Sequence, residues 1–254
     1  NSTTGQFKTV NDGGAPIGTW ASGGDLNTAR RGYDVGAGIQ TAALMSGGYT
    51  TTVVANAEQY DGSSWTEVGD LNTARFASAG SGTTYTAAFL ASGLAPSRVT
   101  NTEIWDGSSW TEVNEVNTAR NSFGGTGSST AGLITSGEIP SVTAKTESWD
   151  GTNWTEVADL NTAGKARITI GTYTSALAVG GSTAAGAPFY AIVEQYDGSS
   201  WTEIADLNTG RGEGAATGTS ALGLAFGGEN PNAVAITEFW NGTSWTEVAD
   251  LATA

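Results

Sequence analysis

The chain has 254 residues, enough for one large all-β domain, so its length does not require two. Its 25 acidic and 10 basic residues give a net charge of −15, which argues against nucleic acid as a partner because phosphate binding needs clustered Lys and Arg. The absence of His and Cys excludes disulfides, zinc sites built on these residues, and catalysis by a Ser-His-Asp triad. No apolar run approaches the ~20 residues that cross a bilayer, so membrane insertion is not expected.

The first 18 residues are interpreted as a lead-in segment, and residues 19–254 as a single domain. Because the chain starts at Asn1 rather than Met, we interpret it as a processed or excised piece of something longer. The domain begins with Trp20 and the short tail DLNTAR at Asp25–Arg30.

A repeated phrase then dominates the chain. DGSSWTEV stands at Asp61–Val68 and again at Asp106–Val113, and edited copies follow at Asp150–Val157, Asp197–Ile204 and Asn241–Val248. The signature tryptophans are Trp20, Trp65, Trp110, Trp154, Trp201 and Trp245. Their spacings, by subtraction, are 45, 45, 44, 47 and 44 residues. A fixed period in this range indicates a solenoid, a propeller or an array.

One unit of the repeat predicts four short strands. Arg31–Gly38 is rich in small residues, Thr41–Ser46 is an apolar run, and Glu58–Tyr60 leads into the tight turn Asp61-Gly62 before the returning strand Trp65–Val68. The aromatic residue before each turn lies five positions ahead of the signature Trp, so the two should form a cross-strand pair. No helical period is present.

Stacking such sheets around an axis buries both of their faces, which predicts an all-β, five-bladed β-propeller with four antiparallel strands in each blade. The small residues of the first strands would line the narrow axis. Trp20 has two interpretations: it belongs to an N-terminal strand that closes the five-bladed ring, which we favour, or to the last strand of a blade removed with an upstream region. The predicted blades are residues 31–68, 76–113, 121–157, 165–204 and 211–248.

The apolar run into Gly47-Gly48, the aromatic-Asp turn and the later Trp resemble the kelch repeat, from about Trp20 to the C-terminus. WD40 repeats are the alternative, because Trp105-Asp106 and Trp149-Asp150 spell that dipeptide, but a chain without His cannot supply their Gly-His pair. The wording DGSSWTEVxDLNTAR is also similar to repeats of virion proteins of marine bacteriophages, especially tail-fibre and capsid-surface proteins. Oxidases of the galactose-oxidase type, which use kelch propellers, hold copper through Tyr and His beside a Tyr–Cys crosslink, so the resemblance does not extend to that chemistry.

The recurrent acids form rings of like positions rather than one asymmetric catalytic pair, so structural roles are favoured. They are Glu58, Glu103, Glu147, Glu194 and Glu238, and Glu67, Glu112, Glu156, Glu203 and Glu247. In the connectors, an acid is expected to pair with an Arg between blades, with an anion site as the alternative. The connector acids are Asp25, Asp70, Glu115, Asp159 and Asp206, and the cations are Arg30, Arg75, Arg120, Arg167 and Arg211. Asn27, Asn72, Asn117, Asn161 and Asn208 are expected to cap these turns.

We expect no cofactor, with calcium on the Asp-Gly turns or acidic surface as an alternative, and we treat the sequons at Asn1, Asn153 and Asn241 as chance matches. Binding residues are expected in the variable loops, where repeat proteins differ between units. The candidates, which suit sugar stacking or a protein partner, are Tyr49, Arg98, Phe189, Tyr190 and Asn232. Phe189-Tyr190 has the alternative role of capping its blade.

The sequence therefore predicts a non-enzymatic structural and binding propeller on a virion surface or fibre, or otherwise extracellular. Its expected partners are host glycans or other virion or surface subunits. The alternatives are a secreted or intracellular bacterial scaffold, and a glycan hydrolase or lyase that uses carboxylates in the central channel.

Overall fold

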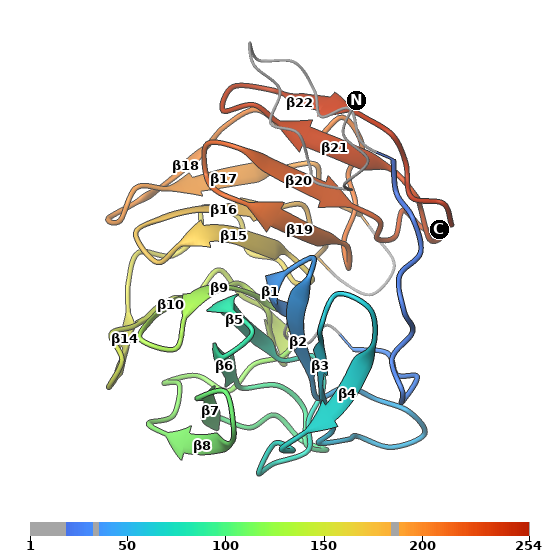
Figure 1. Ribbon diagram of the computed structural model, residues 1–254. Helices are drawn as coiled ribbons and strands as arrows, with labels where there is room; N and C mark the ends of the chain where they lie inside the picture. The colour runs from blue at the N-terminus through green and yellow to red at the C-terminus, as the bar shows by residue number, and fades with distance from the viewer. Residues whose placement is uncertain (1–18, 33–35, 184–187, 254) are drawn as a thin grey trace.

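The computed structural model describes residues 19–32, 36–183 and 188–253, and within these ranges the chain forms strands and loops without helices (Figure 1). The predicted lead-in segment, residues 1–18, lies outside the described residues. Five four-stranded antiparallel sheets stand side by side around an axis, which confirms the predicted all-β, five-bladed propeller.

Each blade is a meander that uses its strands in chain order. Blade 1 contains β1 (Gly36–Ile39), β2 (Ala42–Ser46), β3 (Ala57–Tyr60) and β4 (Trp65–Val68). Blade 2 contains β5 (Ala79–Thr84), β6 (Ala87–Ala91), β7 (Thr102–Trp105) and β8 (Trp110–Val113). Blade 3 contains β9 (Gly124–Ser128), β10 (Ala131–Thr135), β13 (Thr146–Trp149) and β14 (Trp154–Glu156). Blade 4 contains β15 (Ile168–Thr172), β16 (Ser175–Val179), β17 (Val193–Tyr196) and β18 (Trp201–Glu203). Blade 5 contains β19 (Ala215–Gly218), β20 (Gly223–Phe226), β21 (Thr237–Trp240) and β22 (Trp245–Glu247).

Two local details differ from the sequence expectation. The first strand of blade 1 is Gly36–Ile39, whereas Arg31 makes only an isolated bridge to Tyr49. In blade 3 the loop after β10 forms a small hairpin of its own, β11 (Glu138–Ile139) with β12 (Ser141–Val142).

Small residues at the axis follow from the close approach of the first strands. A Cβ on Gly125 would lie 3.1 Å from both the Ala79 Cβ and the Gly80 backbone nitrogen of the neighbouring blade. A Cβ on Gly82 would lie 2.9 Å from the Ala37 Cβ on its other side. Larger side chains at these positions would push the blades apart.

The predicted aromatic pairs are present across every β3–β4-type turn. In blade 2, Trp105 lies opposite Trp110 in the register, with ring centroids 5.5 Å apart. The four equivalent pairs, with centroids 4.9–5.4 Å apart, are Tyr60–Trp65, Trp149–Trp154, Tyr196–Trp201 and Trp240–Trp245. Each pair contributes about 0.5–1.5 kcal/mol beyond the burial of its area.

The core consists of the layers between neighbouring blades. Leu44 on β2 is fully buried and packs with Leu90, Trp105 and Trp110 of blade 2. Three other second-strand residues at the position of Leu44 are also completely buried, namely Phe89, Leu133 and Leu177. Successive apolar residues of a second strand therefore point to opposite faces of the blade and pack in the two interfaces on either side of it.

The connectors hold the blades through a buried carboxylate, and here the expected ion pair is wrong. Arg167 pairs with Glu194 on β17, Nη1 to Oε1 at 3.1 Å, and both side chains are fully buried. Asn161 donates to the other oxygen of Glu194 from its backbone N (2.6 Å) and from Nδ2 (3.0 Å), and the Thr162 backbone N donates to Oε1 at 3.1 Å. The same pairing recurs in Arg30–Glu58, Arg75–Glu103, Arg120–Glu147 and Arg211–Glu238.

The guanidinium turns to the third-strand carboxylate because a buried charge needs a partner far more than an exposed one does. Connector acids instead accept bonds at strand ends, as Asp159 does from the Thr146 backbone N at 3.2 Å. The expected role of Asn as a cap is fulfilled in a different way, because Asn161 also donates from Nδ2 to the Trp201 carbonyl at 2.9 Å.

Blades 5 and 1 are joined by the N-terminal segment rather than by packed inner strands. First strands are close neighbours from blade 1 through to blade 5, but β19 and β1 do not pack comparably among the described residues. Residues 19–32, dark blue in Figure 1, run from blade 5 to blade 1. At one end Trp20 donates from Nε1 to the Ala249 carbonyl (3.1 Å) and lies 4.9 Å from the Phe226 ring.

The other end of this segment behaves as a connector. Asn27 donates from its backbone N to Glu58 at 2.7 Å, and Arg30 pairs with the same carboxylate. Trp65 donates from Nε1 to the Gly24 carbonyl at 3.0 Å. The segment thus links blades 5 and 1, as the favoured interpretation of Trp20 predicted, but it does so as a loop and not as the expected N-terminal strand.

Replacing Arg167 by Met tests the buried network. We expect the free energy of unfolding to fall by about 3–5 kcal/mol, because Glu194 stays buried without its cation. Urea unfolding followed by Trp fluorescence measures the loss. Lys145→Met is the control, since the Lys145–Glu156 pair is partly exposed and such pairs contribute about 0–1 kcal/mol. Equal losses in the two variants would contradict the assignment.

Replacing Trp20 by Ala tests the tie between blades 5 and 1. Trp20 is only half-buried, so we expect a loss of about 1–2 kcal/mol in unfolding free energy. Trp154→Ala at a closed interface, where the side chain is buried, is expected to cost about 3–5 kcal/mol. An unchanged stability in Trp20→Ala would show that this segment does not hold the ring.

Candidate functional site

The five loop residues expected to bind a partner come from four different blades, and most of them are engaged within the fold. Tyr49 lies 5.2 Å from the Phe76 ring and beneath the Arg31 guanidinium, at 5.1 Å. Arg98 donates from Nε to the Asn121 side chain at 2.6 Å. Arg98 also pairs with Glu138 at 3.2 Å. Both side chains therefore serve contacts between neighbouring repeat units.

The other three candidates divide between packing and exposure. Tyr190 lies 5.8 Å from the Arg167 guanidinium and donates to the Ala163 carbonyl at 3.5 Å. Phe189 is half-buried and bridges to Ser182 through the backbone. Asn232 is exposed at a loop tip. Phe189 and Tyr190 thus make packing contacts consistent with the blade-capping role, and binding by these loops stays a prediction.

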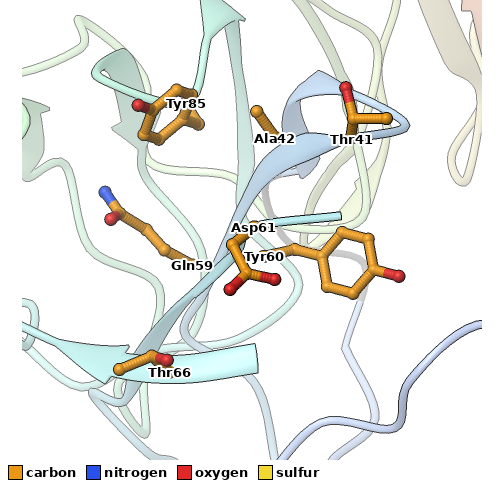
Figure 2. A pocket seen from close by; sticks show the side chains of 7 residues that line it. All are labelled: Thr41, Ala42, Gln59, Tyr60, Asp61, Thr66 and Tyr85. Carbon is orange, nitrogen blue, oxygen red and sulfur yellow. The ribbon is translucent and has the colours of Figure 1, made fainter. Parts of the chain in front are cut away.

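A cavity that sequence reasoning did not find lies between blades 1 and 2 (Figure 2). Its volume is about 340 Å³. It opens at the edge where the β1–β2 and β3–β4 turns lie, which is the opposite end of the blade from the β2–β3 loop that carries Tyr49. The lining residues are Thr41, Ala42, Gln59, Tyr60, Asp61, Thr66 and Tyr85.

Gln59 supplies an amide without a partner. It lies opposite Thr66 in the β3–β4 register, so both side chains are on the blade face that meets blade 2. The Gln59 Nε2 is buried and has no hydrogen-bond partner among the described residues. Figure 2 shows the amide directed to the side on which Tyr85 lies, whereas the Tyr60 ring extends the other way. A buried donor in this state favours a ligand that brings an acceptor.

Asp61 supplies a charged acceptor at the turn. Its Oδ1 accepts hydrogen bonds from the Ser63 backbone N (2.8 Å), the Ser63 hydroxyl (2.7 Å) and the Ser64 backbone N (2.9 Å). These bonds, the one from the Ser64 backbone first, lower the pKa of Asp61 from 3.8 to about 2. The carboxylate is therefore ionised at neutral pH, and its Oδ2 takes no part in these three bonds.

Tyr85 supplies an aromatic surface from the neighbouring blade. It sits in the β5–β6 turn and is 37% exposed. The Tyr85 carbonyl accepts a 3.1 Å hydrogen bond from the Trp105 Nε1, which fixes the turn against a fully buried side chain. This hydrogen bond holds the backbone of the turn, and the Tyr85 ring lines the cavity.

The combination of Gln59 on one blade with Tyr85 on the next occurs at one of the four packed interfaces. At the position of Gln59 the other blades carry Ile104, Ser148, Gln195 and Phe239. At the position of Tyr85 the later blades carry Ser129, Tyr173 and Ser220. Blades 2 and 3 therefore join Ile with Ser, blades 3 and 4 join Ser with Tyr, and blades 4 and 5 join Gln with Ser. The sequence signal for this site is the pairing of Gln with Tyr across one interface, at strand and turn positions rather than in the variable loops.

The recurrent acids offer no comparable site. Every third-strand Glu is buried in an ion pair with a connector Arg. Across the described ranges, no three or more acidic side chains come together as metal ligands. The same ranges contain no helix long and apolar enough to cross a membrane.

Fold and site together define a five-bladed, all-β propeller with a cavity between blades 1 and 2. No protein-family model matches the chain, and a search of curated proteins finds no significant match.

Replacing Asp61 by Asn tests the role of the ionised Asp61 carboxylate in the turn. Asn241 occupies the same position in blade 5 and accepts the same bonds, from the Thr243 backbone N at 2.9 Å and the Ser244 backbone N at 2.9 Å, so the turn should persist. Because the folded pKa of Asp61 lies below its ordinary value, the stabilisation by its charge is complete above about pH 5 and is lost as the pH falls towards 2.

We therefore expect the melting temperature of Asp61→Asn to differ from that of the parent by a constant amount above about pH 5. The variant should gain on the parent between about pH 4 and pH 2. The reverse change, Asn241→Asp, should add acid sensitivity to blade 5. Parallel melting curves at all pH values would contradict the assignment.

Proposed function

We propose that this chain is a non-enzymatic propeller that binds its partners through preformed surface features. It acts on a phage particle surface or fibre, where it contacts host glycans or neighbouring virion subunits. The observation that carries the proposal is the cavity between blades 1 and 2, where an otherwise repetitive structure becomes individual. Individual features on a rigid repeated scaffold are typical of binding modules.

A non-enzymatic role is supported by the state of the acids. Hydrolysis of a glycan by carboxylates needs two acids with different environments on either side of the bond. The third-strand acids instead occupy five equivalent, buried and ion-paired positions. Asp61, with its pKa at about 2, is ionised at neutral pH and is not a general acid there.

The setting on a particle is supported by the repeat wording and by charge. The units resemble those of marine phage virion proteins, and a net charge of −15 keeps a particle surface soluble and away from nucleic acid. Two of the five candidate loop residues, Tyr49 and Arg98, contact the next unit, while Phe189 and Tyr190 pack within their own, which gives this face the rigidity that a subunit contact requires.

A glycan array probed with the full chain, with calcium and with chelator, tests this function. We expect binding to a restricted set of glycans, equal under both conditions, without release of new reducing ends from the bound glycans. A parallel capture assay with the virion proteins of the source particle tests the subunit contact. Cleavage of a bound glycan, or failure of both the array and the capture assay, would contradict the proposal.

A further inference from the structure

The geometry points to the cavity between blades 1 and 2 as a site for one neutral pyranose ring of a glycan. This inference rests on the proposed function and names the ligand class and the residues. A volume of about 340 Å³ lies near the lower end of ligand pockets, so it suits a small ring rather than a long oligosaccharide.

Hydrogen-bonding chemistry selects a hydroxyl-rich ligand. The buried Gln59 Nε2 needs an acceptor, and the ionised Asp61 offers Oδ2 to a donor. A sugar hydroxyl is both donor and acceptor, so the several hydroxyls of one ring can supply a partner to each of the two groups. Thr66, opposite Gln59 in the register, and Thr41 add hydroxyls to the lining of the cavity. A ligand with only donors or only acceptors would leave one of the two groups unpaired.

The aromatic ring of Tyr85 favours a ligand with a flat apolar face. The exposed ring of Tyr85 at the mouth of the cavity can cover the C–H face of a pyranose, and its polar hydroxyl stays in water. The Trp105 hydrogen bond fixes the backbone from which the ring extends, so binding has to order only the side chain of Tyr85. Gln59 and Tyr85 come from different blades, so the site exists only in the assembled propeller.

Charge excludes the acidic sugars. Asp61 is ionised at neutral pH, and the chain as a whole carries a net charge of −15. A uronic or sialic acid would bring a second carboxylate next to the first, which is unfavourable. The site should therefore prefer neutral hexoses and N-acetylhexosamines over acidic sugars of similar size.

Saturation-transfer NMR on the full chain with a panel of neutral methyl glycosides tests the inference. We expect a weak but saturable signal. Gln59→Ala and Tyr85→Ala should each weaken binding about tenfold, the equivalent of one lost hydrogen bond or stacking contact. The controls are Gln195→Ala and Tyr173→Ala, which make the same changes at equivalent positions of other blades and should leave binding unchanged. Thermal melting confirms that all four variants fold.

Asp61→Asn provides a second readout that a purely structural role would not move. It should reduce the discrimination against methyl glucuronide relative to methyl glucoside by several-fold, because the repelling charge is gone while the turn persists. Absence of binding by every neutral glycoside, or equal effects in the test and control variants, would overturn the inference. If the array is positive but these variants bind normally, the proposed function stands and this site assignment fails.

Discussion

The propeller depends on the interaction between the buried Glu carboxylate of each third strand and the connector. Each of these Glu side chains is removed from water and would be unfavourable alone, yet the connector supplies an Arg, an Asn and backbone N–H groups to it. The connector therefore cannot leave its place without exposing an unpaired charge in the interior. At Glu58, burial raises the pKa, but the hydrogen bonds from Asn27, Arg30 and Thr28 outweigh burial and the pKa is lowered. The network thus fixes the path between blades as well as their packing.

Repetition limits where function can reside. Residues that recur from blade to blade, such as Asp61 and Thr66 in the phrase around each signature Trp, cannot by themselves make one blade interface differ from the others. Individuality begins where a unit departs from the pattern, as with Gln59 on β3 and Tyr85 in the β5–β6 turn. Such departures do not disturb the core, because the buried neighbours Leu44 and Trp105 keep their positions. The scaffold therefore tolerates variation at the hairpin edge.

The sequence predicted what is local and repeated. Strand order, the Asp-Gly turns and aromatic pairs such as Trp105–Trp110 follow from spacing within one unit. The partner of Arg167 was predicted wrongly because the choice between Asp159 and Glu194 depends on burial, which no spacing reports. The cavity escaped prediction for a related reason. It joins residues of two units whose alignment across an interface is a tertiary property.

The ring is asymmetric in a way that bears on the site. Met45 on β2 is only half-buried, whereas Leu90, Ile134 and Ala178 at the equivalent position are fully buried. Leu224 on β20 is likewise half-buried, although its equivalent Leu44 is not exposed at all. Within the described ranges, these faces of blades 1 and 5 are bridged by the N-terminal segment. Among the residues that the structure describes, blade 1 therefore packs against blade 2 on one side and against the N-terminal segment on the other. The cavity lies on the side where blade 1 packs against blade 2, so both of its walls belong to one buried interface.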